Sequence, residues 1–215
     1  RGAVEDAKID PAEIDAIWIG SFTPGMFTDQ DHLGPFALEA FPEAFRFKPT
    51  QRVEGACASS SMALYNAVYG IESGRYKNVL VVGVEKMNTR NTRDVTHALA
   101  TASYWPGEGA QGMTFPGLFA EYAKGYKAHY GLTDRQLQEM LASVSAMMYK
   151  NGLENPLAHF GKGSPADRLN LITPEAVIGL PEDKNPMIAE PLRLDDCSLV
   201  TDGAAAVVHT TSDNA

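Results

Sequence analysis

The sequence contains few cysteines and fewer basic than acidic residues. Two of its 215 residues are cysteine, Cys57 and Cys197, and no CxxC pair occurs. This excludes a disulfide-stapled scaffold and argues against a zinc knuckle. Acidic residues outnumber basic ones by 27 to 18, so the net charge is −9. A nucleic-acid-binding protein needs a basic face, so we expect no nucleic acid partner, although local cations can still bind an anionic cofactor.

Long apolar runs are also absent. No stretch reaches the roughly 18 residues that a transmembrane helix needs, so we expect no membrane span. The hydrophobic fraction of 44% and the charged fraction of 21% are ordinary for a globular protein. We therefore expect a protein of the cytoplasm, or of an organelle matrix. The chain of 215 residues is long enough for one sizeable α/β domain, or for a domain with an insertion.

Four runs of the sequence predict β-strands, and the last of them is expected to be buried. They are residues 15–20, 51–56, 78–87 and 202–212. After the second run, apolar residues recur at helical spacing from residue 59 until the chain reaches Gly74. Residues 51–87 are thus a strand–helix–strand unit, which implies parallel strands in a layered α/β sheet.

The pattern changes between about residues 90 and 195, where Gly and Pro are frequent and strand signals are scarce. Helical spacing recurs over residues 117–129 and 133–151, and Thr133 and Gln136 form a capping-box sequence at the start of the second. We interpret residues 91–191 as an insertion of helices and loops. Residues 1–90 and 192–215 would form the α/β domain.

Cys57 falls at the predicted junction between a strand and a helix. The unpaired amides and the dipole at a helix start stabilise a thiolate and can donate to a developing oxyanion. The small residues Ala58 and Ser59 would let a substrate carbonyl approach. Free cysteine, however, is often only a small buried hydrophobe, and Ala and Ser are common at helix starts. Residue types alone leave both interpretations open.

The segment around Cys57 resembles a known family. The stretch VEGACASSSMALYNAVYGIESGRYKNVLVVGVEKM resembles the nucleophile segment of the thiolase family, in the branch of archaeal acetyl-CoA acetyltransferases and sterol-carrier-protein-type thiolases. Residues 114–133 and 155–160 resemble that family's loop domain, and residues 192–208 resemble its return to the sheet. The resemblance covers essentially the whole chain. It implies an α/β fold, the N-terminal half of the thiolase fold, layered α-β-α with a helical loop-domain insertion.

By this resemblance Cys57 is the catalytic nucleophile, which accepts the acyl group of an acyl-CoA as a thioester. Its own backbone amide would help to bind the thioester oxygen. Phe115 and Pro116 match the segment that lines the acyl pocket, with ordinary packing as the alternative. No cofactor is implied beyond coenzyme A as a substrate, and a homodimer or a higher homo-oligomer is expected. The first strand and the C-terminal half are absent from these residues, and that half brings the histidine base and the second catalytic cysteine.

Three functions remain open from the sequence. The first is a thiolase-type acyl-CoA C-acyltransferase, either an acetyl-CoA acetyltransferase or a 3-ketoacyl-CoA thiolase. Ser60 and Ser61 stand where thiolases usually have glycines, which favours a second possibility, a condensing enzyme like the β-ketoacyl synthases. The third is a non-catalytic, thiolase-like scaffold that binds acyl-CoA.

The remaining candidate residues have modest expected roles. Cys197 is expected to be a packing residue, and Glu85 to make a structural hydrogen bond. None of the histidines stands in a sequence motif for a base: His32, His97, His129, His159 and His209. The cations available for CoA phosphates are Lys124, Lys127, Lys150, Lys162 and Arg168, and the sequence does not choose among them.

Overall fold

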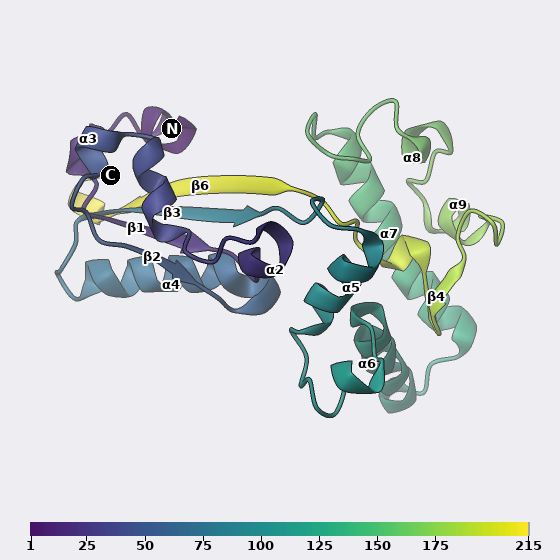
Figure 1. The fold of residues 1–215 in the computed structure, drawn as a ribbon. Coiled ribbons are helices and arrows are strands. Elements are labelled where there is room, and N and C mark those ends of the chain that lie inside the picture. Colours follow the sequence, from purple (N-terminus) through teal and green to yellow (C-terminus); the bar gives the residue numbers. More distant parts are fainter. Residues whose placement is uncertain (215) are drawn as a thin grey trace. The chain divides into compact units, whose positions relative to one another are not determined.

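A computed structural model describes residues 1–214, and the chain divides into two compact units (Figure 1). One unit contains residues 1–102 and the chain from Val200 onward, and the other contains residues 103–199. The helices are α1 (Gly2–Asp6), α2 (Pro24–Thr28), α3 (Pro42–Phe45), α4 (Ser59–Glu72), α5 (Thr92–Ala100), α6 (Phe115–Tyr130), α7 (Asp134–Leu153), α8 (Pro165–Arg168) and α9 (Pro174–Ile178). The strands are β1 (Ala16–Gly20), β2 (Thr50–Val53), β3 (Asn78–Glu85), β4 (Met187–Ala189), β5 (Leu192–Arg193) and β6 (Gly203–Thr210).

The first unit is built on a four-stranded sheet with the order β2-β1-β3-β6. Strand β1 pairs in parallel with both β2 and β3, and β6 runs antiparallel to β3. All five residues of β1 are buried, as expected for a strand with neighbours on both sides and layers on both faces. The four predicted strands and the parallel strand–helix–strand unit are confirmed.

Helices cover both faces of this sheet. On one face, Ala63 and Ala67 of α4 are fully buried against Trp18 and other residues of β1 and β3. On the other face, Ile17 packs in a core with Phe45 of α3. Figure 1 shows α4 along one face of the sheet and α3 on the opposite side. Alternating residues of β1 thus pack into two separate hydrophobic cores, one on each face of the sheet. The predicted α-β-α layering is confirmed.

The last strand is less buried than the sequence suggested. Residues 203–207 of β6 are exposed, and the exposed fraction of Val207 is 47%. Strand β6 is one of the two edge strands of the sheet, so the small residues along it have a neighbouring strand on one side only. The prediction of a buried strand was therefore wrong, because an apolar run does not tell a central strand from an edge strand.

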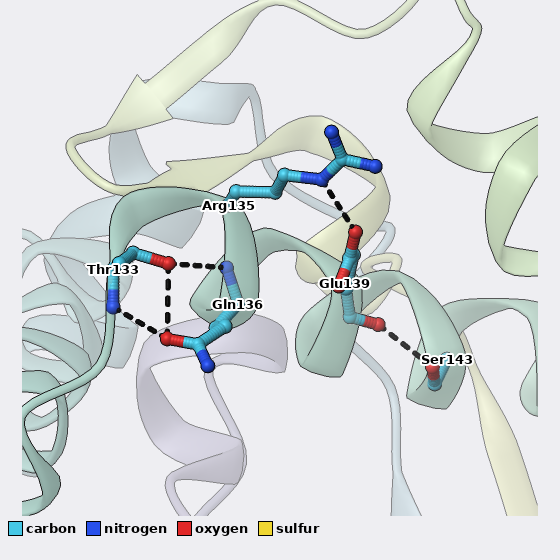
Figure 2. A network of polar contacts seen from close by, with 5 residues as sticks. All are labelled: Thr133, Arg135, Gln136, Glu139 and Ser143. Carbon is cyan, nitrogen blue, oxygen red and sulfur yellow. Dashed lines mark hydrogen bonds and ion pairs between the residues drawn. The ribbon is translucent and has the colours of Figure 1, made fainter.

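The second unit is mainly helical. Helices α6 and α7 confirm the two helical predictions, and the capping box at the start of α7 is formed as expected (Figure 2). Gln136 N–H donates to Thr133 Oγ1 at 3.2 Å, while Thr133 N–H donates to Gln136 Oε1 at 2.9 Å. The short antiparallel ribbon of β4 and β5 in this unit was not predicted. At two or three residues per strand, its sequence signal is too short to stand out from loop.

The division into units differs from the one drawn from the sequence. Helix α5 belongs with the sheet unit, because Val95 and Ala98 pack against Phe27 of α2. Strand β5 belongs with the helical unit through its pairing with β4. The units consequently divide near residues 102 and 199, and not at 90 and 191.

A polar network secures the end of the second unit. The Tyr149 hydroxyl donates to Asp195 Oδ1 at 2.5 Å, and the Ser145 hydroxyl donates to the Asp195 carbonyl at 2.8 Å. Asn185 Oδ1 accepts from the Asp195 N–H at 3.0 Å. Burial, and after it the hydrogen bond to Asp195, raises the pKa of Tyr149 above its ordinary value.

We expect Tyr149→Phe to lower the free energy of unfolding by about 1–3 kcal/mol at neutral pH, because it leaves a partly buried carboxylate without its donor. The raised pKa adds a pH dependence. The folded protein keeps the phenol proton at pH values where the unfolded chain loses it, so this stabilisation declines as the pH rises above about 10. Urea unfolding at several pH values should therefore show the gap between wild type and variant closing above pH 10. Tyr122→Phe, at a side chain 74% exposed, is the control, and a gap that does not change with pH would contradict the assignment.

Candidate active site

Cys57 lies where the chain passes from β2 into α4. It is the middle residue of a short 3₁₀ turn, Ala56–Ala58, and α4 begins two residues after it. The thiol is exposed. The sequence-based placement at a strand-to-helix junction is therefore confirmed. Helix α4 is 14 residues long, so its first turn carries the unpaired amides and partial positive charge of a full helix.

The residue before the cysteine has an uncommon backbone conformation. Ala56 has a φ of 50°, in the left-handed region, which costs a residue with a Cβ about 1–2 kcal/mol. Ser59 makes two hydrogen bonds across this residue: its hydroxyl donates to the Ala56 carbonyl at 2.7 Å and accepts from the Gly55 N–H at 3.1 Å. The Ala56 N–H donates to the Glu54 carboxylate. The strained turn is thus held by side chains on both sides of it.

Two glycines stand where the start of α4 approaches the sheet. A Cβ at Gly20, the last residue of β1, would lie 2.6 Å from the backbone carbonyl of Ser59. A Cβ at Gly83 of β3 would lie 2.2 Å from the hydroxyl oxygen of Ser60. The backbone at Ser59 cannot give way to a Cβ at this distance, whereas the Ser60 hydroxyl can rotate, so glycine at position 20 is what allows the first turn of α4 to lie on the end of β1.

Two charged residues hold the loop that follows β1. Arg52 of β2 donates to the carbonyls of Ser21 and Phe22 at 3.1 and 2.9 Å. Glu85 of β3 accepts from the Phe22 N–H at 2.8 Å and from the Ser21 hydroxyl at 3.3 Å. Glu85 makes the structural hydrogen bonds expected of it. The role of Arg52 was missed, although a basic residue within a strand next to the Cys57 segment was a visible signal.

The other predicted site residues belong to the second unit. Phe115 and Pro116 are the first residues of α6, after the N-cap Thr114. The Phe115 ring lies 5.0 Å from the ring of Phe119, centroid to centroid, so part of its surface is used in local packing. Contact of Phe115 and Pro116 with a substrate stays a prediction.

The five candidate cations for CoA phosphates differ in their present partners. Lys124 pairs with Glu121 at 2.8 Å, and this hydrogen bond raises the pKa of Lys124. Lys127 pairs with Asp134, and Arg168 donates to the Gly163 carbonyl at 2.6 Å. Within residues 1–214, Lys150 and Lys162 make no ion pair. Arg168 makes none there either, so Lys150, Lys162 and Arg168 are the members of the set that would lose no ion pair on binding a phosphate.

The histidines gain no catalytic assignment from their positions. His209 of β6 lies opposite Val79, whereas the start of α4 lies at Gly83, about 13 Å further along β3 at the spacing of a strand. His129 packs edge-on against Tyr130 in α6, with 4.7 Å between ring centroids. His32, His97 and His159 are exposed. The part of the chain that the structure describes also brings together no group of three His, Cys, Asp or Glu residues that could hold a metal ion.

The second cysteine has different surroundings. Cys197 is partly buried, and its thiol donates to the Arg193 carbonyl at 3.5 Å. Burial, and after it the nearby Asp196, raises the pKa of this thiol. A thiol that keeps its proton is a poor nucleophile. These surroundings agree with the packing role expected for Cys197.

Comparison with known proteins shows the family to which the chain belongs. Residues 1–162 match the thiolase N-terminal domain. The acetyl-CoA acetyltransferase of Methanothermobacter thermautotrophicus is 38% identical over 214 residues, covering 100% of this chain and 50% of that protein. The protein of the same name from Methanocaldococcus jannaschii is 39% identical over 213 residues, covering 99% of this chain and 49% of that protein. The chain belongs to the thiolase family, and it spans about half the length of these relatives.

Two weaker likenesses accompany these. A β-ketoacyl-[acyl-carrier-protein] synthase III from Staphylococcus haemolyticus is 31% identical over 111 residues, which cover 51% of this chain and 33% of the synthase. The solved structure of Ltp2-ChsH2(DUF35) aldolase matches with a TM-score of 0.70 and 21% identity, covering 99% of this chain and 48% of that one. At this identity the structural match extends to the fold alone.

In addition, no helix among residues 1–214 is long and apolar enough to cross a membrane.

The contact between α4 and the sheet can be tested at Gly20. Gly20→Ala places a Cβ against the backbone of Ser59, so we expect it to destabilise the protein by about 1–3 kcal/mol and to slow alkylation of Cys57. Gly203→Ala is the matched control, since a Cβ there would have no atom within 4 Å. Thermal unfolding and iodoacetamide labelling measure the two effects. Equal behaviour of the two variants would show that the close approach at Gly20 is not needed.

Proposed function

We propose that this chain provides the nucleophile of a thiolase-type acyl-CoA C-acyltransferase, with Cys57 forming the acyl-enzyme. The observation that carries the proposal is the placement of an exposed thiol at the start of α4, after a strained turn that side chains hold in place. Its relatives named acetyl-CoA acetyltransferase support acetyl-CoA as the acyl donor.

The chemical step follows from this placement. The Cys57 sulfur attacks the thioester carbonyl of acyl-CoA, and a new carbon–sulfur bond forms while the bond to the CoA sulfur breaks. The cysteine gives up its proton and the departing CoA takes one up, so the products are a cysteine thioester and free CoA. Backbone amides at the start of α4 are suited to stabilise the oxyanion of the intermediate. The acyl group then passes to CoA or to an acetyl-CoA carbanion.

No metal or redox group takes part in this proposal, and CoA is the substrate. Of the five candidate cations, Lys150, Lys162 and Arg168 make no ion pair within residues 1–214, and they are candidates to contact CoA phosphates. A homodimer is part of the same proposal. Strand β2 stands at the edge of the sheet, where a second copy has access to unpaired backbone groups.

The β-ketoacyl-synthase alternative draws on Ser60 and Ser61 and on the partial likeness to a synthase III. That likeness covers half of the chain, against the whole chain for the acetyl-CoA acetyltransferases. The scaffold alternative predicts acyl-CoA binding without transfer. The exposed thiol of Cys57 favours a role in acyl transfer over acyl-CoA binding without transfer, and over a packing role for this cysteine.

Intact mass spectrometry before and after incubation with acetyl-CoA tests the proposal. We expect one acetyl adduct on the wild-type protein, an equal adduct on Cys197→Ala, and none on Cys57→Ala, because the acyl group resides on the Cys57 sulfur. Cys197→Ala is the matched control for loss of a thiol. An adduct that persists in Cys57→Ala would refute the assignment of the nucleophile, and binding of CoA without any adduct on the wild type would support the scaffold alternative.

A further inference from the structure

The side chain of Ser59 is buried in the turn from Gly55 to Ser59, and the proposed reaction at Cys57 does not by itself explain this burial. Ser59 is 4% exposed, whereas Cys57, Ala58 and Ser60 around it are exposed. A buried hydroxyl is unfavourable unless both its donor and its acceptor capacity are used. Both are used here, and both within one turn: the hydroxyl donates to the Ala56 carbonyl and accepts from the Gly55 N–H.

These two hydrogen bonds lie on either side of the strained residue. One bond holds the N–H of Gly55, the residue before Ala56, and the other holds the carbonyl of Ala56 itself. Together the two bonds fix the left-handed φ of 50° at Ala56. That region is unfavourable for a residue with a Cβ, so the two hydrogen bonds stabilise an otherwise costly conformation. The conformation of Ala56 in turn sets the direction in which the next residue, Cys57, leaves the backbone.

We propose that Ser59 is a positioning residue, which holds the left-handed turn at Ala56 and thereby fixes the Cys57 thiol at the start of α4. This inference rests on the proposed function, in which that thiol is the nucleophile. Ser59 itself is buried, and its hydroxyl makes both of its hydrogen bonds within the turn. Its effect on the reaction therefore passes through the backbone of Ala56 and Cys57.

The test uses the purified protein and three variants: Ser59→Ala, Ser61→Ala, and the double variant Ser59→Ala/Ala56→Gly. Iodoacetamide labelling is followed by peptide mass spectrometry, with Cys197 as the internal reference thiol. Acetyl transfer from acetyl-CoA gives kcat and KM. Ser61, exposed on the same turn of α4, is the matched serine control.

We expect Ser59→Ala to slow Cys57 labelling relative to Cys197, and to lower kcat, by about tenfold, with KM unchanged. Ser61→Ala should stay within about twofold of wild type. Glycine adopts positive φ without strain, so the double variant should recover most of the lost rate. A residue that acts only by filling space would not be rescued by a glycine three positions away.

Several results would overturn the inference. Ser59→Ala with wild-type labelling does so directly, and failure of the glycine rescue shows that Ser59 acts by packing. If Ser59→Ala does not fold, Ala56→Val strains the same turn while keeping the serine, because a β-branched residue disfavours positive φ; unchanged Cys57 labelling in that variant refutes the proposal. Labelling does not depend on acyl transfer. Slowed labelling in a protein that forms no acyl-enzyme would therefore refute the proposed function and leave the positioning role standing.

Discussion

The close approach of α4 to the sheet is the constraint on which the rest of the first unit depends. The helix can lie this close to the sheet because glycine stands at position 20, opposite the backbone of Ser59, and because Ala63 and Ala67 present small side chains to the strands. A helix raised by the thickness of one methyl group would lose those buried contacts and move the first turn away from the strand ends. The position of Cys57 thus depends on residues outside its own turn.

Charged groups complete this arrangement at the same end of the sheet. Parallel strands end with unpaired backbone groups at their carboxyl edge, and the loop after β1 would leave several of them unsatisfied. Arg52 from one neighbouring strand and Glu85 from the other pair with that loop, one through carbonyls and one through an N–H. Opposite charges on the two flanking strands therefore hold the peptide after Gly20, directly behind the start of α4. This explains why polar residues occur at the ends of otherwise apolar strands.

Much of this fold follows from the sequence, and what does not has physical reasons. The runs at residues 15–20 and 78–87 are long and apolar enough to identify strands, and the Thr133/Gln136 capping box locates the start of α7. Burial of β6 could not be read from its small residues, because strand order decides it. The attachment of α5 to the sheet unit depends on contacts with Phe27, far away in sequence. The left-handed residue before Cys57 is Ala56 and not the neighbouring Gly55, which conformational preferences alone would not suggest.

The two cysteines show how surroundings separate residues that the sequence presents as equals. Packing explains Cys197, which is partly buried, hydrogen-bonded to a carbonyl and next to a carboxylate that disfavours its thiolate. The same explanation does not fit Cys57, because a packing role requires burial and this thiol is exposed in the described part of the chain. An exposed thiol is open to oxidation, and the strained turn before it lowers stability. Residues that reduce stability without filling space are typical of functional sites, so the strained turn supports the proposed role of Cys57 as the nucleophile.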